Sequence, residues 1–248
     1  MKIIKPFFKV YEDLMNPLVT NDMLTKLEMI GRTCYKSESA VTEESSGKFV
    51  RRLIEHGHEA MLEHVSISVE FVVDRGVSHE LVRHRIASFA QESTRYCNYS
   101  KDKFGNEITV IEPLFFNDIP EDQKKKIYIA DTEYCGKESV NPIDFDMYPI
   151  HKKYSAWLRG CMYAEVLYLS QLELGATPQE ARAVLPNSLK TEIWMTCNLR
   201  EWRHVMKLRA AGTTGKPHPQ MVEVMVPLLK YFRTYLPDVF FDIEVPND

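Results

Sequence analysis

Apolar and polar positions alternate most regularly in VSISVEFVV, residues 65–73. A period of two is typical of a half-buried strand, because successive side chains point to opposite faces of a sheet. The apolar face would carry Val65, Ile67, Val69, Phe71 and Val73. We expect Gly76 to break this strand and Ser78 to cap a short helix after it. Shorter apolar runs predict further strands at 7–11, 108–111 and 190–197.

Apolar residues at helical spacing predict several helices. These cover residues 22–31, 43–56, 152–174 and 218–234. Capping residues define two more helix starts. Thr177 precedes Pro178 and is followed by Glu180, which is the pattern of a capping box, and Pro186 ends that helix. Asn198, with Glu201 three residues later, starts the other helix.

The order of these elements indicates the fold class. Helices and strands do not alternate regularly, so the sequence predicts an α+β fold with mixed helices around an antiparallel-type sheet. We expect a single domain over residues 1–248. Residues 101–150 have the weakest pattern and contain Gly105, Pro113, Pro120 and Pro142. They are predicted to form an excursion from the core.

Composition restricts the classes of partner. The net charge of −4 argues against a protein-wide attraction to nucleic acid or to an anionic membrane, so any anion binding must be local. The five cysteines are widely spaced and form no C-x-x-C pair, which indicates neither a disulfide framework nor a cysteine zinc site. No segment approaches the ~20 apolar residues that span a bilayer, and the N-terminal residues lack a signal-peptide pattern. We therefore expect a cytoplasmic protein.

The segment RHRIASFAQESTRY, residues 83–96, concentrates positive charge beside small hydroxyl groups. If its end is extended, Gln91, Ser93 and Arg95 share one face. An amide, a hydroxyl and a guanidinium together suit a phosphate group, because the arginine donates a charge-assisted fork and the serine a short hydrogen bond. The alternative is a surface loop whose arginines pair with acids elsewhere.

A second basic segment is NLREWRHVMKLR, residues 198–209. On a helical wheel its apolar residues form one sector, and Arg200, Arg203, His204 and Lys207 form a neighbouring basic sector. Arg209 falls inside the apolar sector. A buried guanidinium is costly without a partner, so Arg209 requires an anionic or strongly accepting group. A bound ligand, a structural ion pair and a snorkelling side chain all satisfy this requirement.

The histidines do not predict a metal centre. His56, His58 and His64 lie close together in HGHEAMLEH, but we expect them in the core or at a cofactor. HELVRH resembles a zincin helix only superficially, because His79 and His84 are five residues apart and do not share a helix face. We predict no metal site.

Four motifs, taken together, resemble the flavin-dependent thymidylate synthases. RHRIASFAQES contains the family's signature of R-H-R, seven residues and Ser, formed here by Arg83, His84, Arg85 and Ser93. GHEAMLEH (57–64), ARAVLP (181–186) and NLREWRHVMKLR resemble family segments in the family's order. The resemblance covers residues 30–100 and 176–240.

This resemblance implies an α+β homotetramer that makes dTMP from dUMP by reductive methylation. Methylenetetrahydrofolate would donate the carbon, FAD would carry the hydride and NADPH would reduce the flavin. Arg209 would be catalytic and polarise the pyrimidine. The residues implied for dUMP are Glu80, Arg83, Gln91, Ser93, Thr94, Arg95, Arg182 and Arg209. Those implied for FAD are His58, Ala60, Glu63, Arg83, His84, Arg85, Ile86, Gln91, Asn198, Arg200 and His204.

The chain departs from the family pattern at three of these positions. Glu80 stands where a glutamine can occur, Gln91 where a glutamate can, and His204 where an asparagine can. These differences concern individual contacts. Two other classes stay open on the residues alone: a nucleic-acid-binding module that uses the same arginines, and a metal-dependent nucleotide hydrolase that uses the 56–64 histidines.

The family delivers hydride from flavin without an enzyme nucleophile, so the resemblance implies that no cysteine attacks dUMP. Cys97 is the best candidate for a reactive thiol, because it lies two residues after Arg95. The other four cysteines, Cys34, Cys135, Cys161 and Cys197, lie in contexts that predict buried, protonated thiols.

Overall fold

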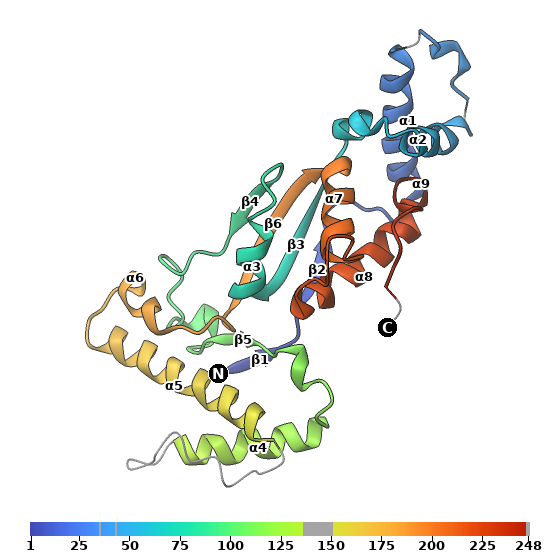
Figure 1. Cartoon of the computed structure of the whole chain (residues 1–248). Helices are drawn as coiled ribbons and strands as arrows, with labels where there is room; N and C mark the ends of the chain where they lie inside the picture. Colours follow the sequence, from blue (N-terminus) through green and yellow to red (C-terminus); the bar gives the residue numbers. More distant parts are fainter. Residues whose placement is uncertain (35, 43, 136–150, 247–248) are drawn as a thin grey trace. The chain divides into compact units, whose positions relative to one another are not determined.

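The computed structural model describes residues 1–34, 36–42, 44–135 and 151–246 (Figure 1). The chain divides into two compact units. The first comprises Met1–Pro6, Val73–Ser78 and Gln91–Thr191, and the second comprises Phe7–Val72, His79–Ala90 and Glu192–Asp248. Each unit combines helices and strands, which confirms the predicted mixture of secondary structure.

A four-stranded sheet forms the framework of the second unit. Its order is β2 (Phe7–Val10), β3 (Ser66–Asp74), β6 (Lys190–Asn198) and β4 (Ser88–Gln91). Strands β2 and β3 are antiparallel, with Phe7 opposite Val72 and Val10 opposite Val69. The predicted antiparallel sheet is therefore confirmed.

The helices of the second unit are α1 (Pro17–Thr33), η1 (Glu38–Ala40), α2 (Ser45–Glu55), η2 (Glu59–His64), α7 (Leu199–Arg209), α8 (Pro219–Tyr235) and α9 (Pro237–Phe240). Trp202 of α7 is fully buried, donates from Nε1 to the carbonyl of Ile67 over 3.0 Å, and packs edge-on against Phe232 of α8. Because these contacts bury large aromatic surface, they fix α7 on the sheet.

The first unit contains a two-stranded sheet that the sequence did not predict to be parallel. Strand β1 (Lys2–Ile4) pairs in parallel with β5 (Thr109–Ile111). The remaining elements of this unit are η3 (Asp102–Phe104), η4 (Leu114–Phe116), α4 (Glu121–Cys135), α5 (Lys152–Glu173), α6 (Pro178–Ala181) and η5 (Arg182–Val184). Helix α3 (Arg75–Leu81) begins in the first unit, and its residues from His79 onward belong to the second. Val110, Tyr168 and Leu189 lie in its core.

Residues 101–135, predicted to form an excursion, are packed into the core of the first unit instead. Ile108 and Val110 are completely buried, and Ile127 of α4 is 2% exposed. Lys124, in the charged EDQKKK run, is buried with its ammonium 3.0 Å from Glu112. The rest of the predicted excursion, residues 136–150, lies outside the described residues.

The start of α3 differs from the prediction. Strand β3 ends at Asp74, and Gly76 and Ser78 both lie inside the helix. Asp74 performs the capping role expected of Ser78, because its Oδ1 accepts from the backbone N–H of Val77 over 2.8 Å. The Ser78 hydroxyl instead donates to the carbonyl of Arg75. An aspartate adjoining the strand thus starts the helix earlier than the glycine suggested.

The two capping predictions near the C-terminal half are confirmed. Glu180 accepts from the backbone N–H of Thr177 over 2.8 Å, which completes a capping box at α6. Asn198 accepts from the backbone N–H of Glu201 over 2.9 Å and begins α7. Helix α1 begins earlier than predicted, at Pro17, because Asn16 accepts from the N–H of Leu18.

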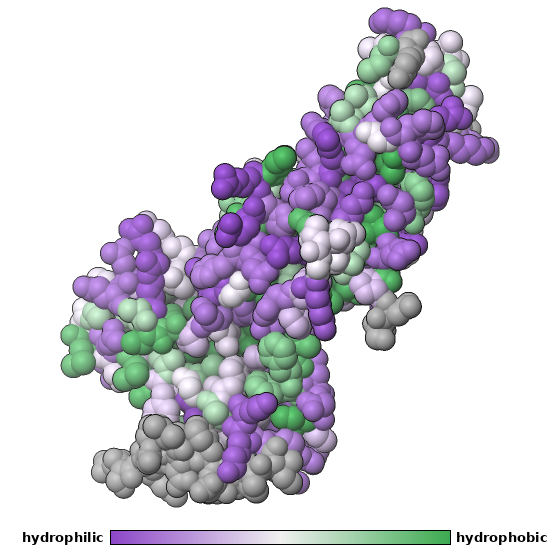
Figure 2. All heavy atoms as spheres, viewed as in Figure 1, coloured by the Kyte–Doolittle hydropathy of each residue, from purple (hydrophilic) through white to green (hydrophobic). Residues whose placement is uncertain are grey.

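Surface hydropathy varies over the first unit. Figure 2 shows hydrophobic side chains gathered at the C-terminal end of α5, where Leu174 is 87% exposed. Along the described part of the chain, none of the helices combines the length and apolar character needed to cross a bilayer.

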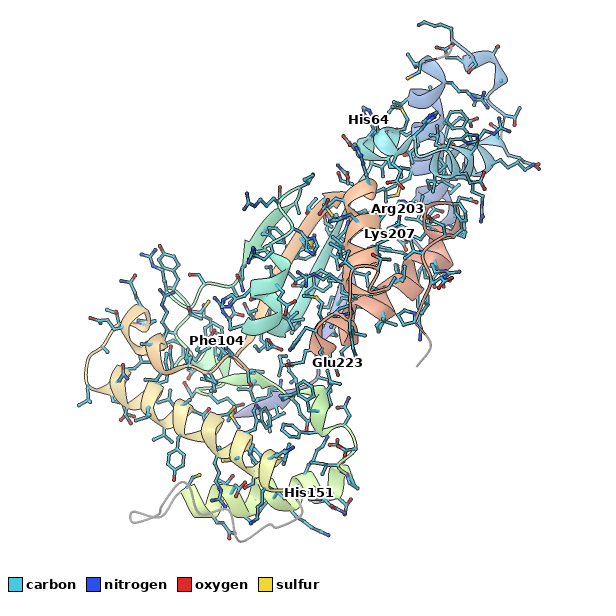
Figure 3. The ribbon with its side chains drawn as sticks, in the orientation of Figure 1. His64, Phe104, His151, Arg203, Lys207 and Glu223 are labelled. Carbon is cyan, nitrogen blue, oxygen red and sulfur yellow. The ribbon has the colours of Figure 1, made fainter. Side chains whose placement is uncertain are left out.

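Arg203 joins three parts of the second unit. It lies on α7 beside Lys207 (Figure 3), and its side chain is 1% exposed. The guanidinium donates to Glu59 of η2 over 3.0 and 3.2 Å and to both carboxylate oxygens of Asp242 over 2.7 and 2.8 Å. It also donates to the carbonyl of Val239. Arg203 was predicted to belong to a basic sector, but it is a buried ion-pair centre.

We expect Arg203→Met to lower the free energy of unfolding by about 3 kcal/mol, because it leaves two partly buried carboxylates without their partner. Burial alone would raise the pKa of Asp242, but hydrogen bonds from Arg203 lower it. The contribution of this pair is therefore present above the unfolded pKa and is lost as pH falls below about 4. Urea unfolding at pH 7 and at pH 3.5 measures both effects.

Arg51→Met is the matched control, because Arg51 pairs with Asp238 but its side chain is 39% exposed. We expect this exposed pair to contribute less than about 1 kcal/mol. Equal losses in the two variants would contradict the role assigned to Arg203.

Candidate active site

The signature segment leaves strand β4 as a turn. Strand β4 ends at Gln91, and the backbone N–H groups of Tyr96 and Cys97 donate to the carbonyl of Ser93 over 3.0 and 2.9 Å. The prediction that Gln91, Ser93 and Arg95 alternate along an extended segment is therefore wrong after Gln91. The turn brings the hydroxyl of Ser93 within 3.3 Å of the backbone nitrogen of Arg95.

Two arginines meet this turn in the first unit. Arg182 of η5 donates to the Thr94 hydroxyl over 3.2 Å, and Arg95 donates to the side-chain carbonyl of Gln179 over 2.8 Å. Both arginines are exposed. Within the described residues neither guanidinium has a carboxylate partner. The alternative in which the signature arginines pair with acids is therefore wrong for Arg95, and both positive charges are available to a ligand.

Gln91 is held by neutral side chains at the start of this turn. Its amide nitrogen donates to the hydroxyls of Ser78 and Thr191 over 2.9 and 3.2 Å. The neighbouring Glu92 pairs with Lys190 over 3.0 Å and accepts from the Tyr99 hydroxyl. The acidic residue is therefore neutralised within the first unit, while Gln91 adds no charge to the turn.

The remaining dUMP candidates, Glu80, Arg83 and Arg209, belong to the second unit. Arg209 donates from Nη1 to Glu80 Oε2 over 2.7 Å, from Nη2 to the Glu80 carbonyl over 3.4 Å, and from Nε to His84 Nε2 over 3.2 Å. The predicted need of Arg209 for an anionic partner is confirmed, and Glu80 supplies it. Arg83 is exposed.

His84 is the buried member of the R-H-R signature. Burial lowers the pKa of its imidazole to about 4, and the nearby positive charges of Arg209 and His204 contribute. Its Nδ1 lies 3.4 Å from Glu201 Oε1. Burial raises the pKa of the Glu201 carboxyl. The ring is therefore neutral at pH 7 and lies between a guanidinium and a carboxyl group.

His84, Glu201 and His204 also present donor atoms within 4.8 Å of one another. Such a set suits a cation, and the sequence predicted no metal site. However, Arg209 already donates to His84 Nε2, and its charge lies beside the three side chains. The positive charge of Arg209 therefore opposes a cation at this cluster.

A hollow in the second unit collects many of the predicted flavin residues. It is lined by Glu59, Glu63, Ile86, Asn198, Arg200, Glu201, His204 and Lys207. Arg200 donates to Glu63 over 2.5 Å. An adjacent hollow is lined by Gly31, Cys34, Leu53, Gly57, His58, Ala60, Met61 and Arg200. Arg200 thus connects the two groups of residues that the motifs predicted.

Some predicted flavin residues lie outside these hollows, and some lining residues were missed. Arg83 and Arg85 are exposed and line neither hollow, and Gln91 belongs to the first unit. Sequence reasoning missed Glu59, Glu201 and Lys207 as lining residues. The helical spacing of Arg200, His204 and Lys207 contained the signal for Lys207, which Figure 3 shows on α7.

Burial disfavours the thiolate form of four of the five cysteines. Burial raises the pKa of Cys97, which packs against the core of the first unit. Burial also raises the pKa of Cys135, Cys161 and Cys197. Cys34 was predicted to be buried, but it is exposed in the hollow beside His58. None of the five, all of which lie in the described part, forms a disulfide.

A family model described as thymidylate synthase complementing protein matches residues 18–238. The chain belongs to this family. A flavin-dependent thymidylate synthase from Mycobacterium avium is 28% identical over 228 residues, which cover 88% of this chain and 79% of the relative. The relative of the same name from Corynebacterium glutamicum is 28% identical over 223 residues, with the same coverage of both chains.

Solved structures support the same fold. Thymidylate synthase X from Helicobacter pylori, determined with FAD and dUMP, is 21% identical with a TM-score of 0.62, and the match covers 96% of this chain and 98% of that one. The UMP/dUMP methylase PolB from Streptomyces cacaoi, bound to 5-Br UMP, is 19% identical with a TM-score of 0.67 over 97% and 95% of the two chains.

These matches confirm the family predicted from the R-H-R signature. The chain is a member of the family to which the flavin-dependent thymidylate synthases belong. Neither a nucleic-acid-binding module nor a metal-dependent nucleotide hydrolase is supported by the family match.

We expect Cys34 to react fastest with Ellman's reagent, because it is the exposed thiol and the others have raised pKa values. Cys34→Ser should remove the fast phase of labelling, whereas Cys97→Ser should leave it unchanged. Both folded variants should retain dTMP formation. A fast phase that disappears in Cys97→Ser would contradict the burial of that thiol.

Proposed function

We propose that the chain methylates dUMP to dTMP and that Arg95 and Arg182 bind the phosphate of dUMP. One observation carries this proposal: Arg95 and Arg182 converge on the Ser93–Thr94 turn, and among the described residues their guanidinium groups are bonded to neutral groups. Two uncompensated guanidinium groups beside two hydroxyls suit a phosphate monoester, which accepts charge-assisted hydrogen bonds. Gln91 would orient the nucleotide without adding charge.

Arg209 would act on the pyrimidine. Its planar guanidinium offers a fork of N–H donors in fixed directions, which suit an acceptor such as a uracil carbonyl oxygen. Donors fixed before the reaction stabilise charge that develops on the base. Glu80 and His84 hold this fork in place, so the arginine is oriented before substrate arrives. Arg83 would make a further contact to dUMP.

The two hollows of the second unit fit a flavin nucleotide. Asn198, Arg200, His204 and Lys207 present donors that suit flavin carbonyl and phosphate oxygens, and Ile86 presents an exposed apolar side chain. When bound, FAD supplies the hydride. The residues that would hold it are His58, Ala60, Glu63, Arg83, His84, Arg85, Ile86, Gln91, Asn198, Arg200 and His204. Lys207 would add a cation at the edge of the hollow.

We propose methylenetetrahydrofolate as carbon donor and NADPH as reductant, as the family resemblance implies. The same resemblance supports a homotetramer in the cytoplasm. The direct test is dTMP formation by the purified chain with FAD, dUMP, methylenetetrahydrofolate and NADPH, with each component omitted in turn. A colourless protein that takes up no FAD and forms no dTMP would overturn the proposal.

Arg182→Met should raise the KM for dUMP roughly 10- to 100-fold, because one charge-assisted hydrogen bond contributes about 1.5–3 kcal/mol. The affinity for FAD should not change. Binding of deoxyuridine, which lacks the phosphate, should be equal in variant and wild type. Lys101→Met, at an exposed cation of the same unit, is the control and should leave KM unchanged. Equal losses for dUMP and deoxyuridine would refute the assignment of Arg182 to the phosphate.

Arg209→Lys should lower dTMP turnover by orders of magnitude while FAD stays bound. Lysine keeps the charge, but it lacks the planar fork that bonds Glu80 and His84 together. Steady-state turnover and flavin absorbance of the same sample measure the two effects. A variant within about three-fold of wild type, which is less than ~1 kcal/mol, would show that Arg209 does not polarise the base.

A further inference from the structure

Four side chains of the second unit form a continuous line of polar contacts through the R-H-R signature. Glu80 accepts from Arg209 Nη1 over 2.7 Å, and Arg209 Nε donates to His84 Nε2 over 3.2 Å. On the other side of the imidazole, His84 Nδ1 lies 3.4 Å from Glu201 Oε1. Glu201 is buried on α7, within the 198–209 motif, but the resemblance implied no site role for it.

This arrangement determines the tautomer of His84. A guanidinium is always protonated, so Arg209 Nε acts only as a donor and His84 Nε2 must be an unprotonated acceptor. The neutral ring therefore carries its proton on Nδ1, which faces Glu201. The opposite tautomer would place two N–H groups against each other and leave Arg209 Nε without its acceptor.

Glu201 is itself held in position. Its backbone N–H donates to Asn198 Oδ1 over 2.9 Å in the first turn of α7. A carboxylate in the first turn interacts favourably with the helix dipole. The Asn198 cap thus fixes the backbone of Glu201, whose carboxyl group faces His84. Arg209 is the last residue of the same helix.

We propose that Glu201 is a positioning residue: it holds His84 in the Nδ1-protonated tautomer, so that Nε2 accepts from Arg209 and fixes the guanidinium that polarises the pyrimidine. This inference deepens the proposed function and rests on the role given there to Arg209. Glu201 does not touch the substrate. It acts through His84, in the way that an acidic partner selects the tautomer of many functional histidines.

The charged groups around the ring set the pH range of this arrangement. His84 is faced by Glu201, His204 and Arg209 from α7, and Glu80 of α3 bonds the far side of Arg209. His218 lies 4.0 Å from Glu80. Burial, followed by Arg209 and His204, lowers the pKa of His84 to about 4. The bond from Arg209 therefore persists at neutral pH and is lost as pH falls through that value.

Two substitutions separate the acceptor from the rest of the side chain. Glu201→Gln keeps a carbonyl that accepts from Nδ1, whereas Glu201→Leu has a similar volume and no acceptor. We expect kcat to fall roughly 10- to 100-fold in Glu201→Leu, which corresponds to one lost hydrogen bond to a charged network. In Glu201→Gln, kcat should stay within about three-fold of the wild-type value. The KM for dUMP should change little in both.

The tautomer itself is the second readout. Nitrogen-15 NMR of histidine-labelled full-length protein, with the His84 signals assigned through a His84→Gln variant, reports which ring nitrogen is protonated. In wild type and Glu201→Gln the proton should be on Nδ1, and in Glu201→Leu the two tautomers should mix. Glu70→Leu is the matched control, because Glu70 is a partly buried acid of the same unit that faces Lys9; neither kcat nor the tautomer should change.

Each outcome decides the inference. A wild-type His84 that carries its proton on Nε2 overturns it, even if Glu201→Leu fails to fold. Glu201→Leu with normal kcat and an unchanged tautomer also overturns it, and Glu201→Gln as slow as Glu201→Leu shows that negative charge, not the acceptor, is required. The NMR measurement needs no substrate. A wild-type protein that has the expected tautomer but forms no dTMP would therefore refute the proposed function and leave the orientation of His84 established.

Discussion

The attachment of α7 to the sheet is the contact on which the second unit depends. Trp202 buries its ring against Phe71 and Phe232 and uses its indole N–H on the carbonyl of Ile67. Because a helix turns 100° per residue, fixing Trp202 also fixes the direction of every other side chain on α7. Arg200, His204 and Lys207 then line the hollow. Apolar packing in the core thus determines where the chemistry lies.

In this unit, Arg203 is more deeply buried than Arg209 and has more carboxylate partners. Arg203 is buried and has two carboxylate partners, Glu59 and Asp242, as a desolvated guanidinium requires. Arg209 is half-buried and has one carboxylate and two neutral acceptors, His84 Nε2 and the Glu80 backbone carbonyl. The first unit shows the opposite condition, since Arg95 and Arg182 are exposed and bonded to neutral groups. Hydration supports their charge in the absence of a carboxylate partner among the described residues.

Sequence patterns predicted the elements better than their junctions. The alternation in residues 66–73 and the cap at Asn198 are local properties, and both are correct. The predicted start of α3 was wrong because both Asp74 and Gly76 are residues that can end a strand. Only the tertiary structure shows that the strand continues to Asp74, which caps the helix. The prediction of an extended segment after Gln91 was wrong. The turn found there is formed by backbone hydrogen bonds to the Ser93 carbonyl, and such bonds do not show in the periodicity of the side chains.

The candidate site shows the same division. Motifs predicted site roles for Arg200, His204 and Arg209 from the residue types themselves, and the structure places Arg200 and His204 at one hollow and Arg209 beside His84. They did not identify Glu201, whose importance comes from facing His84 across more than one hundred residues of sequence. The wheel placed Arg203 with the basic residues, although its ion-pair partners Glu59 and Asp242 are remote in sequence and bury it. Long-range partners of this kind require a structure.

The two ways of holding arginine suit two different kinds of ligand, an anion and a neutral base. A phosphate is bound best by guanidinium groups whose charge is uncompensated, as at Arg95 and Arg182. A neutral pyrimidine gains little from net charge, and it requires donors in fixed directions instead. Glu80 offsets the charge of Arg209, while Glu80 and His84 fix the orientation of its fork. A glutamate at position 80 therefore favours direction over charge at Arg209, the arginine that we propose for the base.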